Sequence, residues 1–136
     1  MRTRCMTTLL TLLATMTILG CGPSGMDLHP VSGKVTFDGE PIAEGRIQFR
    51  ALEGDQRAFS GQINNGQYEL DTLPGKMTVE VTASRLIPGE FDESNPDEKV
   101  PVGEMYIPAR YNSETELTAE IPASGIKQLD FALTSE

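Results

Sequence analysis

The chain is poor in the residues that most catalytic and metal sites need. Its 136 residues include one histidine, two cysteines and no tryptophan, and aromatic residues make up 6%. A catalytic triad needs a histidine beside its nucleophile, and a zinc site needs three or four ligands. The single histidine, His29, precedes Pro30, and we expect it to be an exposed residue of a tether. We therefore expect no catalytic residues, no enzyme activity, no cofactor and no metal.

Basic residues are also scarce. Eleven Lys and Arg residues stand against 20 Asp and Glu, which gives a formal net charge of −9. Arg2 and Arg4 are the only charged residues among the first 20, so the rest of the chain carries −11. Such a surface repels phosphate backbones, and this excludes nucleic acid as an expected partner. The acidity favours solubility outside the cytoplasm; attraction of cations or of a basic partner is the alternative.

The N-terminus has the pattern of a secretory signal. Residues 6–19 form an apolar run that only threonines interrupt. The run is shorter than the ~20 residues that span a bilayer, and it follows two arginines. It ends in Ile18-Leu19-Gly20-Cys21, which resembles the bacterial lipobox, where a cysteine thiol receives a diacylglycerol. We predict that residues 1–20 are a cleaved lipoprotein signal peptide and that acylated Cys21 contacts membrane lipid.

Residues 21–30 read as a flexible tether, because Gly22-Pro23-Ser24-Gly25 follows the cysteine. Cys5 lies in the cleaved segment, so the domain must fold without a disulfide. By resemblance to the sorting rule of some bacteria, a glycine rather than an aspartate at position 22 favours the outer membrane. We expect a lipid-anchored protein of the bacterial cell envelope.

From residue 31 onward, apolar and polar residues alternate with period two, the pattern of half-buried strands. Turn signals separate the runs, among them Asp38-Gly39, Asn65-Gly66 and Pro74-Gly75. The runs cover residues 31–37, 47–51, 59–63, 68–70, 77–83, 117–121 and 129–133. We predict that residues 31–136 fold as one all-β domain, a seven-stranded antiparallel β-sandwich.

The alternation lapses over residues 85–112, which hold four prolines and a charged centre. We expect a long, partly ordered excursion whose most mobile part is residues 90–99. Tyr106 and Tyr111 are expected to pack this excursion onto the sandwich; a platform for a sugar or peptide is the alternative.

The acidic stretch at positions 90–99 offers oxygen atoms of the kind that suit Ca²⁺. Its spacing does not match an EF-hand loop, because a proline lies inside and the loop glycine is missing, so we expect a solvated loop. The side chains in question are Glu90, Asp92, Glu93, Asn95, Asp97 and Glu98.

Two stretches resemble the carboxypeptidase-regulatory-like, transthyretin-like domains. The first runs from Val31-Ser32-Gly33-Lys34-Val35 through Asp38-Gly39-Glu40-Pro41-Ile42 to Gly45-Arg46-Ile47-Gln48-Phe49. The second comprises Gly66-Gln67-Tyr68-Glu69-Leu70, Leu73-Pro74-Gly75 and the strand at 77–81. With the lipobox and Ile107-Pro108-Ala109-Arg110-Tyr111-Asn112, the chain is similar to small acidic bacterial lipoproteins. The resemblance implies a transthyretin-like or immunoglobulin-like sandwich and no catalytic residues.

Together these features predict a non-catalytic, membrane-tethered binding or structural module of the cell envelope. Its partner besides membrane lipid is an envelope protein or a polysaccharide, and the sequence leaves that choice and the oligomeric state open. A Ca²⁺-dependent adhesion module, separable by calcium titration, and an accessory hydrolase are the alternatives.

Acylation of Cys21 is the most direct prediction of the sequence. Mass spectrometry of the mature N-terminus, purified from the native host, should find a lipid-modified Cys21 as the first residue. An unmodified cysteine, or cleavage at another bond, would contradict the assignment.

Overall fold

The computed structural model describes residues 25–95 and 97–136, and the predicted signal peptide and Cys21 lie outside these ranges. The described chain is all-β, as predicted. It has ten strands and one short 3₁₀ turn, η1 (Ala109–Tyr111). The strands are β1 (His29–Phe37), β2 (Glu40–Pro41), β3 (Glu44–Ala51), β4 (Ala58–Asn64), β5 (Gln67–Thr72), β6 (Gly75–Thr82), β7 (Ser84–Asp92), β8 (Val100–Met105), β9 (Thr118–Ile121) and β10 (Phe131–Leu133).

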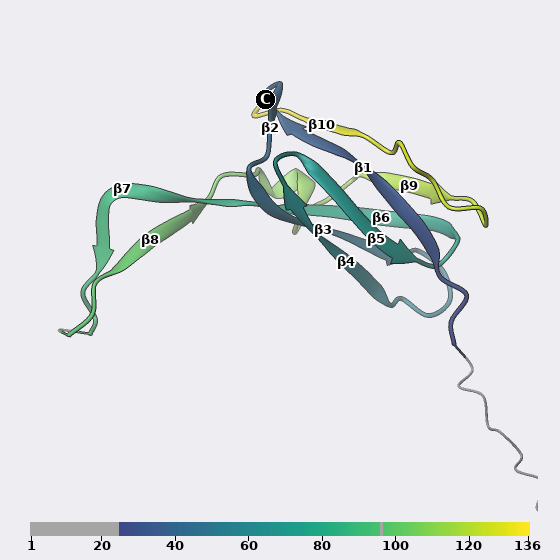
Figure 1. Ribbon diagram of the computed structural model, residues 1–136, viewed down its shortest axis with the longest axis horizontal. Coiled ribbons are helices and arrows are strands. Elements are labelled where there is room, and N and C mark those ends of the chain that lie inside the picture. The colour runs from purple at the N-terminus through teal and green to yellow at the C-terminus, as the bar shows by residue number, and fades with distance from the viewer. Residues whose placement is uncertain (1–24, 96) are drawn as a thin grey trace, which may run out of the picture.

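Eight strands form one curled sheet. Its order is β10-β1-β5-β4-β3-β6-β9, and β2 pairs with β1 beside this path (Figure 1). The two ends of the order, β9 and β10, are joined by only the residues 122–130. The sheet is curled, and this brings its two ends toward each other (Figure 1). The result is a half-barrel whose inner face encloses the core.

β1 changes its pairing partner along its length, and β10 joins the sheet there. Residues 29–34 pair antiparallel with β5, whereas residues 35–37 pair parallel with β10. The prediction of an all-antiparallel sheet was therefore wrong for this one pair. The segment that follows β9 crosses the end of the half-barrel before it reaches β1. β10 then runs parallel to β1, and no hairpin joins the two strands.

The predicted turns are confirmed. Asp38 and Gly39 have φ values of 51° and 84°, and Asn65 and Gly66 have 49° and 76°. Two consecutive residues with positive φ fit the tight hairpins between β1 and β2 and between β4 and β5. Gly75 also has positive φ, at 116°, as the second central position of a type II turn requires.

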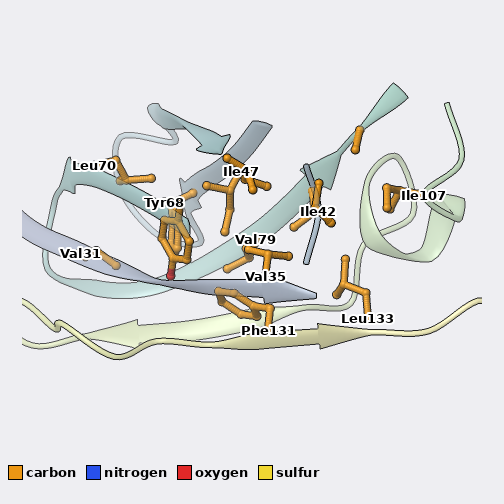
Figure 2. Close-up of a cluster of buried hydrophobic side chains, with 14 of the residues drawn as sticks. Val31, Val35, Ile42, Ile47, Tyr68, Leu70, Val79, Ile107, Phe131 and Leu133 are labelled. Carbon is orange, nitrogen blue, oxygen red and sulfur yellow. The ribbon is translucent and has the colours of Figure 1, made fainter. Parts of the chain in front are cut away.

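The period-two alternation places one side of each predicted strand in the core. The fully buried apolar side chains come from six strands and the segments beside them, and Figure 2 shows many of them in one cluster. They include Val31, Val35, Ile42, Ile47, Phe49, Ile63, Met77, Val79, Val81, Ile121 and Leu133. Phe131 of β10 closes the cluster, with its ring centroid 6.3 Å from that of Phe49.

The expected excursion at 85–112 is in large part a β-hairpin, and the expectation of irregular structure was wrong there. β7 and β8 form a separate two-stranded sheet that projects from the body (Figure 1). Nearly all of its side chains are exposed, so it lacks the buried-and-exposed alternation by which strands are recognised. The count of seven strands was too low for the same reason, and because the short β2 has no pattern of its own.

A single contact joins β5, β1 and the returning C-terminal segment. Gly33 lies opposite Tyr68 in the β1–β5 register, and the Tyr68 hydroxyl donates a hydrogen bond to the Leu129 carbonyl oxygen at 2.7 Å. A Cβ atom on Gly33 would lie 2.0 Å from that same oxygen. Figure 2 shows the Tyr68 hydroxyl directed at β1. The closure therefore needs a residue without a side chain at position 33.

We predict that Gly33→Ala lowers the free energy of unfolding by about 3 kcal/mol, because the new methyl group must displace the Leu129 backbone. Gly103→Ala is the matched control: its Cβ would find only the Arg85 carbonyl oxygen, at 3.8 Å. That variant should stay within about 0.5 kcal/mol of the wild type. Urea denaturation gives both values, and equal effects would contradict the closure.

A candidate binding groove on the outer face of the sheet

On β1, β4 and β5, every second side chain points into the core. The side chains between them point outward and are polar. A groove of about 790 Å³ lies over them, hereafter the amide groove. Its floor includes Gly33 and Tyr68. The other lining residues are Ser32, Lys34, Gln62, Asn64, Gln67, Glu69, Lys127, Gln128 and Asp130.

The C-terminal segment forms one wall of the groove and is held firmly against β1. The Leu129 amide donates to the Ser32 carbonyl at 3.0 Å, and the Ser32 hydroxyl donates to the Lys127 carbonyl at 3.2 Å. The Lys34 amide donates to the Asp130 carboxylate at 2.7 Å. The bonds that close the half-barrel thus also fix the wall of the groove.

Four carboxamides line the groove, and within the described residues their side chains make no hydrogen bond. They are Gln62, Asn64, Gln67 and Gln128. Each carries two N–H donors and one carbonyl acceptor. The groove therefore presents donors and acceptors side by side to a ligand.

The charges of the groove are balanced, unlike those of the whole chain. Lys34 and Lys127 stand against Glu69 and Asp130. These are two of the four lysines in a chain of net charge −9. An acidic ligand that the rest of the surface repels meets no net repulsion here.

Tyr68 forms part of the floor but is unsuited to proton transfer. Burial raises the pKa of its phenol far above the ordinary value, and the nearby Asp130 carboxylate raises it further. Its proton is engaged with the Leu129 carbonyl. Tyr68 is therefore a structural residue of the groove.

His29 lies outside the groove, and its predicted exposure was wrong. It is the first residue of β1, opposite Thr72 of β5, and its side chain is 14% exposed. Its Nε2 atom lies 3.7 Å from a carboxylate oxygen of Asp27. The β1–β5 ladder extends two residues beyond the predicted start of the domain and covers this side chain.

The prediction that Tyr106 and Tyr111 pack onto the body is confirmed. The Tyr106 ring packs edge-on against Phe37, with centroids 5.5 Å apart. The Tyr111 hydroxyl accepts a hydrogen bond from the Thr134 amide at 3.2 Å. Arg110 lies over the Tyr111 ring at 4.9 Å and donates to the Thr134 carbonyl at 2.6 Å. These contacts hold the C-terminus against η1.

The acidic stretch lies at and near the tip of the β7–β8 hairpin. The Ser94 hydroxyl and amide both donate to the Asp92 carboxylate, and they lower the pKa of Asp92 in that order of importance. Within residues 25–95 and 97–136, no three His, Cys, Asp or Glu side chains are placed to hold a metal ion. The same ranges contain no helix with the length and apolar character needed to cross a membrane.

Comparisons with known proteins do not identify a family or an activity for this chain. No protein-family model matches the chain, and no curated protein matches it either. Among solved structures, part of a 9R-lipoxygenase from Cyanothece PCC8801 is similar at a TM-score of 0.35 and 12% identity. The match covers 79% of this chain and 16% of the lipoxygenase chain, and at this score it carries no argument about fold or activity.

The amide groove was not recognised from the sequence. Gln67 and Glu69 stand in an alternating strand, Asn64 lies beside the Asn65-Gly66 turn, and no pattern singles out Gln62. Residues 127–130 follow no signal that would place them beside β1. The groove arises from the parallel return of the C-terminal segment, which local patterns do not encode.

Tyr111 gives a spectroscopic test of the C-terminal contacts. Its hydrogen bonds with the Thr134 hydroxyl and amide, and then the Arg110 guanidinium, lower the pKa of its phenol from 10.0 to about 8. The folded protein should therefore show one tyrosine ionising near pH 8 by ultraviolet absorbance. Because the folded pKa is lowered, folding releases protons between pH 8 and 10, and the free energy of unfolding should rise with pH over that window.

Tyr111→Phe should abolish the ionisation near pH 8, whereas Tyr106→Phe should leave it in place. If the absorbance step survives in Tyr111→Phe, the assignment of the lowered pKa to this residue is wrong.

Proposed function

We propose that this chain is a non-catalytic binding module of the bacterial cell envelope, tethered to the outer membrane through acylated Cys21. In this proposal the amide groove binds a polysaccharide of the envelope. The observation that carries it is the set of four carboxamides without hydrogen bonds among the described residues, which lie beside balanced charges and next to a wall that hydrogen bonds hold in place.

The chemistry of the groove suits a hydroxyl-rich ligand. A sugar hydroxyl both donates and accepts hydrogen bonds, and so does a carboxamide. The chain has no tryptophan, so stacking on an indole ring contributes nothing to the affinity. Four net hydrogen bonds at about 1 kcal/mol each correspond to a Kd on the order of 1 mM.

A weak site of this kind suits a tethered protein. Seven residues separate Cys21 from the start of β1 at His29. Fully extended, they span at most about 25 Å, so the domain stays close to the membrane surface. Many anchored copies acting on one polymer gain avidity, which compensates for a weak individual contact.

The test uses full-length protein in lipid vesicles and an array of purified bacterial polysaccharides. We expect at least one polysaccharide to bind. The double variant Gln62→Ala/Gln67→Ala should weaken that binding about tenfold, since each substitution removes a hydrogen-bonding group worth about 0.5–1 kcal/mol.

Gln56→Ala is the matched control, because Gln56 is an exposed glutamine outside the groove. It should bind like the wild type. The groove would lose its assigned role if no polysaccharide binds, or if the double variant and the control behave alike.

A further inference from the structure

The β7–β8 arm, residues 84–105, has an uncovered apolar surface. Six large hydrophobic side chains are exposed within the described residues, and four of them lie on this arm. Their exposed fractions are 65% for Leu86, 47% for Phe91, 50% for Val100 and 55% for Met105. Apolar groups of this size gathered on one projecting element mark interaction sites more often than chance exposure.

The strand register places three of the four on one face. Residues directly opposite each other in an antiparallel pair share a face, and so do alternate residues of one strand. The register shifts between Leu86 and Phe91, where β7 bulges, so the faces are followed along β8. There Met105, Gly103 and Pro101 share a face, and their partners on β7 are Ser84, Leu86 and Phe91. The opposite face carries Arg85, Glu104, Asp92 and Val100, and the alternation along β8 places Val102 there as well. The first face, with Leu86, Phe91 and Met105, is therefore the more apolar of the two, and the opposite face is mixed.

At its base the arm contacts the body through Arg85 and Tyr106, and elsewhere no described residue covers its apolar side chains. Arg85 donates to the Glu104 carboxylate at 2.7 Å and lies 5.5 Å from the centre of the Tyr106 ring. Tyr106 in turn packs on Phe37 of the body. A two-stranded hairpin alone is marginally stable in water, so a surface that covers its apolar face would stabilise it.

The charges of the arm indicate what kind of surface that is. Six acidic and two basic residues lie between positions 84 and 105, a net charge of −4. A second copy of this chain, with net charge −9, would be repelled, and so would an anionic membrane surface. The arm also projects from the side of the body opposite the N-terminal end of β1 (Figure 1).

We propose that the β7–β8 arm docks by its Leu86–Phe91–Met105 face into an apolar groove of another protein, and that lysine or arginine side chains rim this groove. The apolar side chains provide the affinity, and the acidic tip orients the arm and selects the partner. This proposal rests on the arm alone and is independent of the amide groove.

The test places a photo-crosslinking amino acid at position 86 of the full chain in the native host. The crosslinked peptide is then identified by mass spectrometry. We expect one defined partner protein, crosslinked through a peptide that contains apolar residues and neighbouring Lys or Arg. The same amino acid at Ser60, an exposed position on the outer face of β4, serves as the control and should not give this product.

Substitutions on the two faces of the arm then separate the proposed face from the arm as a whole. With the identified partner purified, Leu86→Ser and Phe91→Ser should each weaken binding about tenfold. Val100→Ser, equally exposed on the opposite face, should leave binding unchanged, and Glu93→Gln/Glu98→Gln should weaken it about threefold. Circular dichroism verifies that each variant is folded.

Three results would overturn the proposal. They are crosslinks at position 86 only to lipid or to another copy of the chain, no crosslinked product at all, and equal losses for Leu86→Ser and Val100→Ser. None of these outcomes bears on polysaccharide binding by the amide groove, so the two proposals fail separately.

Discussion

The hydrogen bond from the Tyr68 hydroxyl to the Leu129 carbonyl, made across Gly33, is the contact on which the rest of the structure depends. It joins the middle of the sheet to a segment that arrives from the far end of the chain. The bare backbone at Gly33 lets that segment lie close enough for Phe131 and Leu133 to enter the core. Without this approach, the inner face of β1 would lack its cover. The same close contact places residues 127–130 beside the outer face of the sheet. One contact therefore shapes both the core and the amide groove.

The two surfaces proposed to bind partners differ in the way they are built. The amide groove lies on the sheet, and backbone hydrogen bonds of the closed half-barrel fix its shape. The β7–β8 arm projects from the body and is held mainly through Arg85 and Tyr106 at its base. A rigid polar groove suits many weak hydrogen bonds to a polymer, whereas a projecting apolar arm suits insertion into a protein partner. Under the two proposals, one small domain would join a polysaccharide to a protein partner.

Local sequence patterns predicted what local physics controls. Period-two alternation identified the core positions of most strands, and Asp38-Gly39 and Asn65-Gly66 identified two hairpins, because positive φ is a property of single residues. Patterns failed where the outcome depends on distant contacts or on missing burial. The parallel pairing of β10 with β1 follows from a return across the whole barrel. The sequence predicts a loop in place of the arm because the strands of the arm are exposed on both faces. It predicts a tether residue at His29 because the β1–β5 ladder extends further than its apolar residues do.

Native-state hydrogen exchange of single amides tests the central role of the closure most directly. The decisive amides are those of Ile126, Leu129 and Asp38, which donate to Pro30, Ser32 and Leu133 at 2.9, 3.0 and 2.9 Å. If the closure is integral to the fold, these amides exchange only through global unfolding, as slowly as those at the centre of β3 and β6. If they exchange as fast as the amides of the β7–β8 arm while β3 and β6 stay protected, the C-terminal segment is a detachable appendage and the account is wrong.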